Sequence, residues 1–251
     1  MLFQEGDKLF LAPPNIHGDY SIPEGTEVVC KSAFSSCSLK RIIMPSTLRV
    51  IEENAFSDCR ELEEAIIPEG VEYIGRGAYE NCHKLSKVSI PESITTLPDD
   101  VFKMCWNLKE VILPSSLIAI GAGSFSECRE LIEVDIPESV RIIGAGAFSG
   151  SSINSITLPS SIRRIGCWAF SHCNNLIEIT APEKVTRIEH NTFRRCISLK
   201  RIALGEGIEE IDPSAFEECP ELEEIIIHKP KSSIDINKLI IPETCSIIWN
   251  N

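Results

Sequence analysis

Apolar residues return along this chain in one fixed frame. Each unit opens on an aromatic residue, and Cys, Leu and alternating aliphatic residues follow before a Pro-containing turn, as in "AYENCHKLSKVSIPESITTLPDD". The aromatic positions, 22 or 23 residues apart, are Phe34, Phe56, Tyr79, Phe102, Phe125, Phe148, Phe170, Phe193 and Phe216. This period predicts a solenoid, because no unit can bury its apolar face alone and each must stack on the next.

Each unit contains one clear strand signal. Val88 and Ile90 alternate with polar residues, and Pro91 then ends the pattern because it cannot donate to a ladder. Val140 and Ile143 indicate a turn or a second short extended piece. The segment from the aromatic residue to the Cys is predicted to be one short helical turn. Strands of successive units are expected to lie parallel, about 4.8 Å apart.

Glycine recurs at one further frame position. The glycines are Gly75, Gly121, Gly144 and Gly166. We expect the backbone there to need a conformation that is costly for other residues.

The frame "SFSECRELIEVDIPESVRIIGAGAF" resembles the BspA-like leucine-rich repeat family, known mainly from bacterial surface proteins and some protozoa. The resemblance covers residues 23 to about 227. It implies an α/β leucine-rich repeat solenoid, here with nine coils of 22–23 residues, and a continuous parallel sheet on the concave side. It also implies protein binding, since some members are adhesins for host proteins, and it transfers no catalytic motif.

The ends of the chain depart from the frame. We interpret residues 1–24 as an N-terminal cap, residues 25–227 as the solenoid and residues 228–251 as a C-terminal cap, all within one domain. Terminal units must hide an open core edge, so irregular apolar caps are expected.

Charge and hydropathy limit the partners. The net charge of −13 disfavours nucleic acid and anionic lipid. No apolar run approaches the roughly 20 residues that a membrane-spanning helix needs, so no membrane insertion is expected. We expect a monomer. The lack of a signal peptide and the free cysteines favour the cytoplasm, whereas the resemblance implies the cell surface or secretion, and both locations stay open.

Two neighbouring units carry opposite charges in the same frame: "FRRCISLKRI" from Phe193 becomes "FEECPELEEI" from Phe216. If residues 23 apart face each other, the pairs are Arg187 with Glu210, Arg194 with Glu217, Arg195 with Glu218, Lys200 with Glu223 and Arg201 with Glu224. Near the start, Lys40 and Arg41 would face Glu63 and Glu64. Glu64 would then face Lys87, and Lys87 would face Glu110. We favour a role in coil register over a dipole that steers a partner.

Eight of the eleven cysteines share one frame position. They are Cys37, Cys59, Cys82, Cys105, Cys128, Cys173, Cys196 and Cys219. We predict a buried ladder of free thiols, because cross-coil spacing exceeds the roughly 3.8 Å between Cβ atoms of a disulfide. Close zinc-binding pairs are missing from the sequence, and we expect no metal and no cofactor.

Catalytic motifs are also missing. The glycine-rich "GAGSF" and "GAGAF" belong to the repeat, and the five histidines share no frame position. The chain is therefore predicted not to be an enzyme. An enzymatic reading would need a cleft at the irregular C-terminal end.

Outward positions of the predicted concave sheet are the candidate binding residues. They are Ile43, Glu64, Ile66, Lys87, Ser89, Glu110, Ile112, Glu133 and Asp135, with Trp106 added as an exposed aromatic residue. Exposed isoleucines flanked by charges fit a protein interface, although isoleucine also simply suits a strand. The leading hypothesis is a non-catalytic protein–protein interaction module, and a cell-surface adhesin or a structural spacer are the alternatives.

Overall fold

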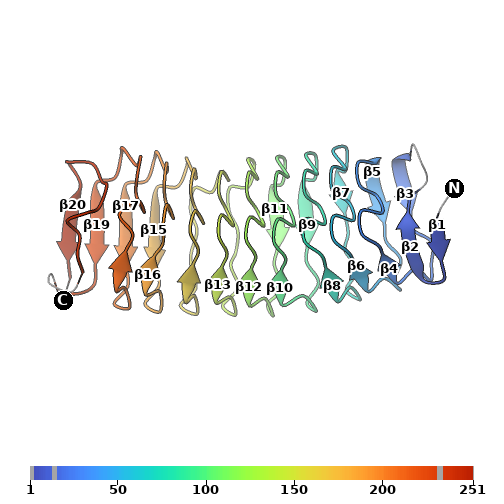
Figure 1. Ribbon diagram of the computed structural model, residues 1–251, viewed down its shortest axis with the longest axis horizontal. Helices are drawn as coiled ribbons and strands as arrows, with labels where there is room; N and C mark the ends of the chain where they lie inside the picture. Colours follow the sequence, from blue (N-terminus) through green and yellow to red (C-terminus); the bar gives the residue numbers. More distant parts are fainter. Residues whose placement is uncertain (1–2, 13–15, 231–233, 251) are drawn as a thin grey trace.

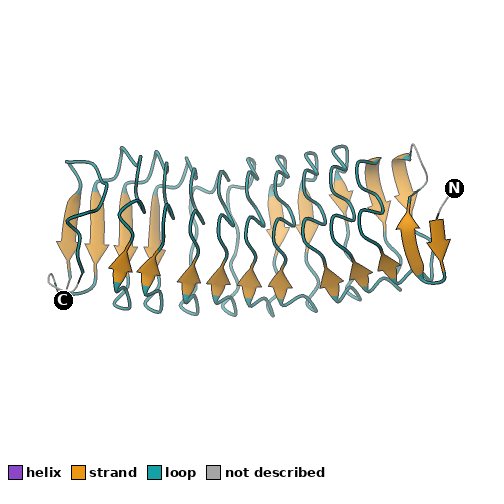
Figure 2. Cartoon of the chain, in the orientation of Figure 1, coloured by secondary structure: helices purple, strands orange, loops and turns teal. Residues whose placement is uncertain are grey.

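The computed structural model describes residues 3–12, 16–230 and 234–250. The chain winds into a solenoid whose coils lie side by side along one long axis, with the two termini at opposite ends (Figure 1). Strands occupy two faces, and turns occupy the third (Figure 2). The predicted leucine-rich repeat solenoid is confirmed.

The strand that precedes the repeat's proline forms one face, here called the first sheet. It has two hydrogen-bonded blocks. The first block contains β3 (His17–Ser21), β5 (Ser38–Ile43), β7 (Glu64–Ala65), β9 (Lys87–Ser89) and β11 (Glu110–Ile112). The second block contains β15 (Glu178–Ala181), β17 (Arg201–Leu204), β19 (Glu224–Ile227) and β20 (Ser246–Trp249).

Shorter strands after the proline form the second sheet, which has three blocks. The first contains β1 (Phe3–Glu5), β2 (Lys8–Leu11), β4 (Val28–Val29), β6 (Val50–Ile51) and β8 (Tyr73–Ile74). The others contain β10 (Thr96–Leu97), β12 (Ala119–Ile120), β13 (Ile142–Ile143) and β14 (Arg164–Ile165), then β16 (Arg187–Ile188) and β18 (Glu210–Ile211). Apart from the antiparallel β1–β2 pair, the ladders are parallel.

Both ends of the solenoid are tied to these sheets. β2 and β3 pair with the first repeat's β4 and β5. β1 then covers the edge of β2, and β20 adds a last strand to β19. The expected caps therefore continue the sheets, which leaves fewer strand edges open.

The third face is a backbone ladder built from turns, here called the turn ladder: the five residues centred on each aromatic position. The Phe56 N–H donates to the Ala78 carbonyl at 2.8 Å, and the Asp58 N–H donates to the Glu80 carbonyl at 2.8 Å. Asn54 and Asp58 have φ of 56° and 58°, in the left-handed region. The first and last of the five turn residues are left-handed, and the N–H groups of the first, third and fifth residues donate to the next coil.

The predicted helical turn is therefore wrong, because the described residues contain no helix. A helix would direct each N–H back along its own segment, whereas here alternate N–H groups bond across coils. The helical part of the predicted α/β class is absent from the described residues, and the solenoid is built from strands and turns.

The expectation for the frame glycines also needs correction. Gly75 and Gly144 do not have positive φ values. Glycine is needed at this position because neighbouring coils approach closely. A Cβ on Gly144 would lie 2.6 Å from the Ala122 nitrogen. Steric exclusion by the neighbouring backbone, and not an unusual conformation, selects glycine there.

The core runs along the solenoid axis as a column of aromatic rings. All nine rings are buried, and successive ring centres lie 5.1–5.8 Å apart with nearly parallel planes. Tyr20 covers the N-terminal end of the column at 5.7 Å from Phe34. Offset stacking of this kind adds to the burial energy of each ring, about 0.5–1.5 kcal/mol per pair.

The ladder of free thiols is confirmed: seven of its eight cysteines are buried and Cys37 is half-buried. It has a hydrogen-bonding reason. The Phe56 carbonyl accepts the N–H of Cys59 at 3.3 Å and the thiol of Cys82 from the next coil at 3.2 Å. Six further ladder thiols make the same bond at 3.0–3.2 Å. A small side chain with one weak donor satisfies the inward carbonyl without needing water. All eleven cysteines are unpaired.

Candidate binding face

The outer face of the first sheet carries two columns of side chains, one step per coil. Register pairs Arg41 with Glu64, Glu64 with Lys87 and Lys87 with Glu110, as predicted. The second column includes Ile112 next to Ser89. Since strand side chains alternate between faces, both columns point away from the core.

The second column is apolar in its N-terminal half. Ile43, Ile66 and Ile112 are 59%, 68% and 46% exposed, so none of them contributes to the core. Lone exposed isoleucines are ordinary, but three in one column form an apolar strip with a single polar position, Ser89. We call Ile43, Ile66, Ser89 and Ile112 the apolar strip.

Charges border the strip. Lys87 and Glu110 form an ion pair at 2.7 Å. Arg41 bonds Asp19 of β3 instead of its register partner Glu64, and this hydrogen bond lowers the pKa of the Asp19 carboxyl. The expected Arg41–Glu64 ion pair is therefore replaced, although the register is the predicted one.

Beyond Ile112 the first sheet is interrupted. The coils that contain Glu133 and Ser155 have no strand on this face. Two adjoining hollows of about 180 and 520 Å³ lie there, and Ser155, Ile156 and Thr157 line both. The predicted residues Glu133 and Asp135 line the smaller hollow.

This interruption was not predicted from the sequence. Small side chains replace Ile and long charged residues at Ser155 and Thr157 in the interrupted part, and at Thr180 and Ala203 in the next two strands. The one-residue deletion between Ser151 and Ile153 lies in the same coil. Either feature could have predicted that the strand ladder of the first sheet is interrupted in this coil.

Trp106 lies apart from both columns, in the turn before β11. Its ring stacks on His83 with centres 3.7 Å apart and planes 6° apart, and the Arg129 guanidinium carbon lies 5.1 Å from the indole centre. Burial and nearby Arg60 lower the pKa of His83. Neighbours from the preceding and following coils stack on Trp106. Its ring therefore packs between coils and is not available as a binding surface.

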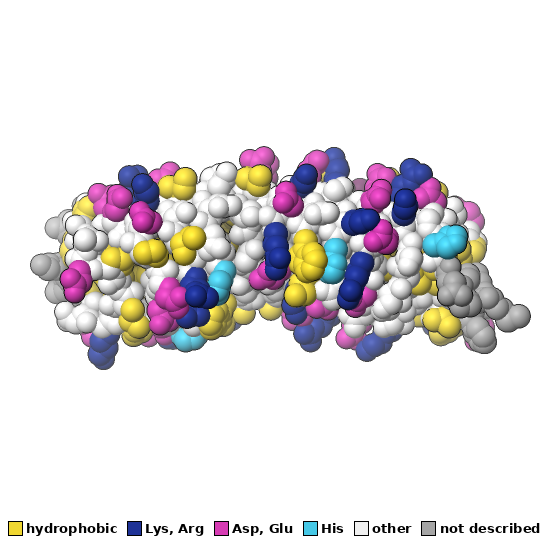
Figure 3. Space-filling view, turned by 90° about the horizontal axis from the view of Figure 1, so that it is seen from above, with side chains coloured by type: hydrophobic (Ala, Val, Ile, Leu, Met, Phe, Trp, Pro, Cys, Tyr) yellow, Lys and Arg dark blue, Asp and Glu magenta, His cyan; other side chains and the backbone are white. Residues whose placement is uncertain are grey.

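All five predicted pairs from the opposite-charge units are confirmed. The ion pairs are Arg187–Glu210 at 3.1 Å, Arg194–Glu217 at 3.1 Å, Arg195–Glu218 at 2.5 Å, Lys200–Glu223 at 3.9 Å and Arg201–Glu224 at 3.1 Å. Figure 3, which views the molecule from the upper edge of Figure 1, shows acidic and basic side chains interspersed along this edge. Facing charges neutralise each other locally, which supports the register interpretation.

Within the described ranges, no group of three His, Cys, Asp or Glu side chains could hold a metal ion. In the same residues, no helix is long and apolar enough to cross a bilayer.

Parallel strands in stacked coils, a buried leucine in the repeat frame such as Leu62 and Leu85, and an exposed sheet face define a leucine-rich repeat β-solenoid. The chain belongs to the BspA type leucine rich repeat family, whose model matches residues 17–132 and 118–241.

Solved structures similar to this chain come from several bacteria. The Treponema pallidum leucine rich repeat protein is 26% identical, covers 73% of this chain and 78% of its own, and has a TM-score of 0.57. A Bacteroides ovatus leucine-rich repeat protein is 23% identical over 93% of this chain and 84% of its own, with a TM-score of 0.42. A leucine rich cell surface protein from Faecalibacterium prausnitzii is 22% identical over 93% and 96%, with a TM-score of 0.40. No curated protein matches the chain.

Proposed function

We propose that this protein is a non-catalytic binding module that holds a protein partner on the outer face of the first sheet. The observation that carries the proposal is the apolar strip, whose three isoleucines are 46–68% exposed in one column. Such a strip gains free energy when a partner covers it, about 25 cal/mol per Å² of apolar area.

The bordering charges add selectivity to this face. Lys87 and Glu110 already satisfy each other, whereas Glu64 has no ion pair among the described side chains. A partner with an apolar ridge and a basic residue opposite Glu64 would fit both features. Complementary charge of this kind mainly sets orientation and association rate.

Paired alanine variants test the proposal. Ile66→Ala with Ile112→Ala should lower partner capture about fivefold or more, since truncation of an interface anchor typically costs over ~1 kcal/mol. Immobilised protein would be exposed to bacterial and host-cell extracts, and bound proteins quantified by mass spectrometry. Melting curves must show that the variant stays folded.

Ile118→Ala with Ile142→Ala is the matched control, because both residues are 42% exposed and belong to the second sheet's side. The proposal fails if the two pairs of variants capture the same proteins equally well. Capture of no protein by the wild type would favour the spacer. Selective capture from host extracts would favour an adhesin.

A further inference from the structure

The turn ladder has an open end at the ninth coil. In the coil before it, the N–H groups of Phe193 and Arg195 donate to the Ala215 and Glu217 carbonyls, each at 2.9 Å. The matching N–H groups of Phe216 and Glu218 have no acceptor among the described residues.

The chain beyond the ninth coil does not continue this ladder. The Ile240 N–H donates to the Pro213 carbonyl at 2.9 Å, so the segment touches the ninth coil before the aromatic position. No aromatic ring of the described residues stacks on Phe216 from this side, although Phe216 is fully buried and Ile241 packs against the core. An unpaired ladder edge of this kind is a template for another segment of backbone.

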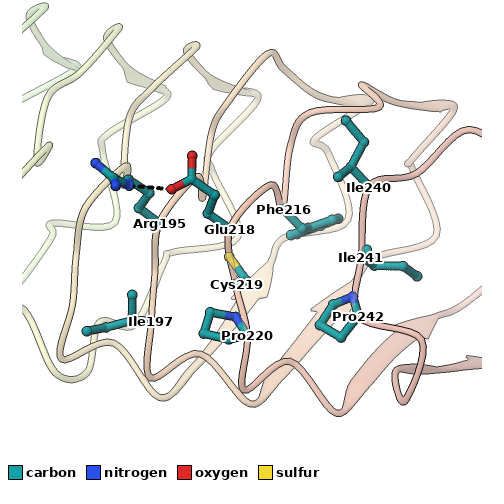
Figure 4. Close-up of a pocket in the computed structure, with 9 residues that line it drawn as sticks. All are labelled: Arg195, Ile197, Phe216, Glu218, Cys219, Pro220, Ile240, Ile241 and Pro242. Carbon is teal, nitrogen blue, oxygen red and sulfur yellow. Dashed lines mark hydrogen bonds and ion pairs between the residues drawn. The ribbon is translucent and has the colours of Figure 1, made fainter.

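A hollow of about 640 Å³ lies beside this edge. Phe216 and Cys219 form its buried base, and Ile197, Pro220 and Ile240 stand around it (Figure 4). Ile197 and Ile240 are 49% and 51% exposed. The Arg195–Glu218 ion pair lies at one side (Figure 4).

The apolar lining distinguishes this place from the rest of the same edge. The residue after each ladder Cys is polar in most coils, such as Arg60 and Arg129, but it is Ile197 and then Pro220 here. The hollow therefore combines an exposed apolar surface with an unpaired backbone donor at its rim, the Glu218 N–H.

We propose that this hollow binds a turn segment of another protein, with an aromatic side chain in the hollow and a backbone carbonyl on the Glu218 N–H. The ninth coil shows how such a segment binds: it places the Ala215 and Glu217 carbonyls on the eighth coil, with the Phe216 ring between them, 5.8 Å from Phe193. The proposed partner repeats the backbone contact one step further along, at the Glu218 N–H. Because Phe216 is already fully buried, the partner's ring lies against the exposed Ile197, Pro220 and Ile240 side chains. The inference does not depend on the binding face of the first sheet.

A second copy of this chain does not supply the segment. The chain's own aromatic turns are buried in the column, and Tyr20 covers the ring of Phe34 at its N-terminal end. The occupant is therefore a segment of a different protein, with a Phe or Tyr flanked by residues that accept left-handed φ.

A peptide with the sequence of residues 146–152, GAFSGSS, is a suitable ligand for the test. Gly146 and Gly150 take φ of 61° and 71° in the protein, so glycines stand where the turn needs them. Its affinity for the full chain would be measured by NMR titration of the Glu218 and Ile240 amide signals. The matched peptide GAASGSS should bind about tenfold more weakly, because it lacks the ring.

Two protein variants locate the binding. Ile240→Glu puts a carboxylate in the hollow and should weaken the GAFSGSS affinity at least about tenfold. Ile177→Glu is the control, since Ile177 is also 51% exposed but lies outside the hollow. Ile197→Glu, at another wall, serves if the Ile240 variant does not fold.

The proposal is overturned by any of three results: no saturable binding at millimolar peptide, equal binding of the two peptides, or equal effects of the hollow and control variants.

Discussion

At the scale of the residue, the aromatic column shows how strictly the coil interior selects side chains. Eight of its nine positions are Phe, and Tyr79 is the exception. The Tyr79 ring is buried and stacks normally, with centres 5.2 and 5.7 Å from its neighbours. Its hydroxyl is buried without a hydrogen-bond partner in the described part of the chain. Burial raises the pKa of Tyr79 well above its ordinary value, so the hydroxyl stays protonated.

Tyr79→Phe should therefore stabilise the protein. An unpaired buried hydroxyl costs about 1–3 kcal/mol, and phenylalanine removes it while keeping the ring. Thermal unfolding should show a melting temperature about 2–4 °C higher for each kcal/mol gained. Tyr73→Phe is the control, because Tyr73 is 54% exposed and should tolerate the change without effect. A lower melting temperature for Tyr79→Phe would mean that the hydroxyl is bonded.

At the scale of the element, facing charges show how the coils keep their order. Arg201 of β17 lies between Glu178 of β15 at 3.3 Å and Glu224 of β19 at 3.1 Å. Its side chain is 54% exposed, so each pair contributes little to stability. A slip of β15 by one residue would place Ile177 or Ile179 opposite Arg201 in place of Glu178. The ion pair would then be lost, which is why we assign these pairs to register.

Arg201→Glu should destabilise the protein by about 1–2 kcal/mol, since it removes two attractions and adds two repulsions. The triple variant Glu178→Arg, Arg201→Glu, Glu224→Arg restores alternation and should recover most of the loss. Urea unfolding measures both. If the single variant were as stable as wild type, the charges would not act on register. The better explanation would then be a charge dipole that steers a partner.

At the scale of the whole molecule, the cysteine ladder makes the free energy of unfolding depend on pH in the alkaline range. Burial raises the pKa of Cys59 and Cys173 to about 12. The unfolded state loses these protons near pH 9, whereas the folded state keeps them. Stability from each thiol is therefore complete below pH 9 and is lost as the pH rises toward 12.

Each such thiol should contribute about 1.4 kcal/mol per pH unit to the slope of stability between pH 9.5 and 11. Cys59→Ala should reduce this slope by about that amount, and adding Cys173→Ala should reduce it about twice as much. Urea unfolding at a series of pH values gives the slopes. The slope, unlike the stability itself, is insensitive to the cavity that each alanine leaves. Parallel curves for the wild type and both variants would show that the thiols ionise equally in both states.

The repeat period alone was enough to predict the solenoid, the cysteine ladder and the pairs such as Arg194 with Glu217. The period sets all of them, because residues one period apart must become neighbours once the coils stack.

The period does not determine the backbone conformation of a turn residue. Asn54 and Asp58 therefore take left-handed φ values in the turn ladder, where the sequence predicted a helical turn. Nor does it choose among nearby partners: Arg41 bonds Asp19, and His83 and Arg129 stack on Trp106. The interrupted first sheet and the hollow beside Phe216 are likewise consequences of packing between coils that differ from the repeat. These choices turn on small energy differences set by neighbours distant in the chain, and only the folded structure resolves them.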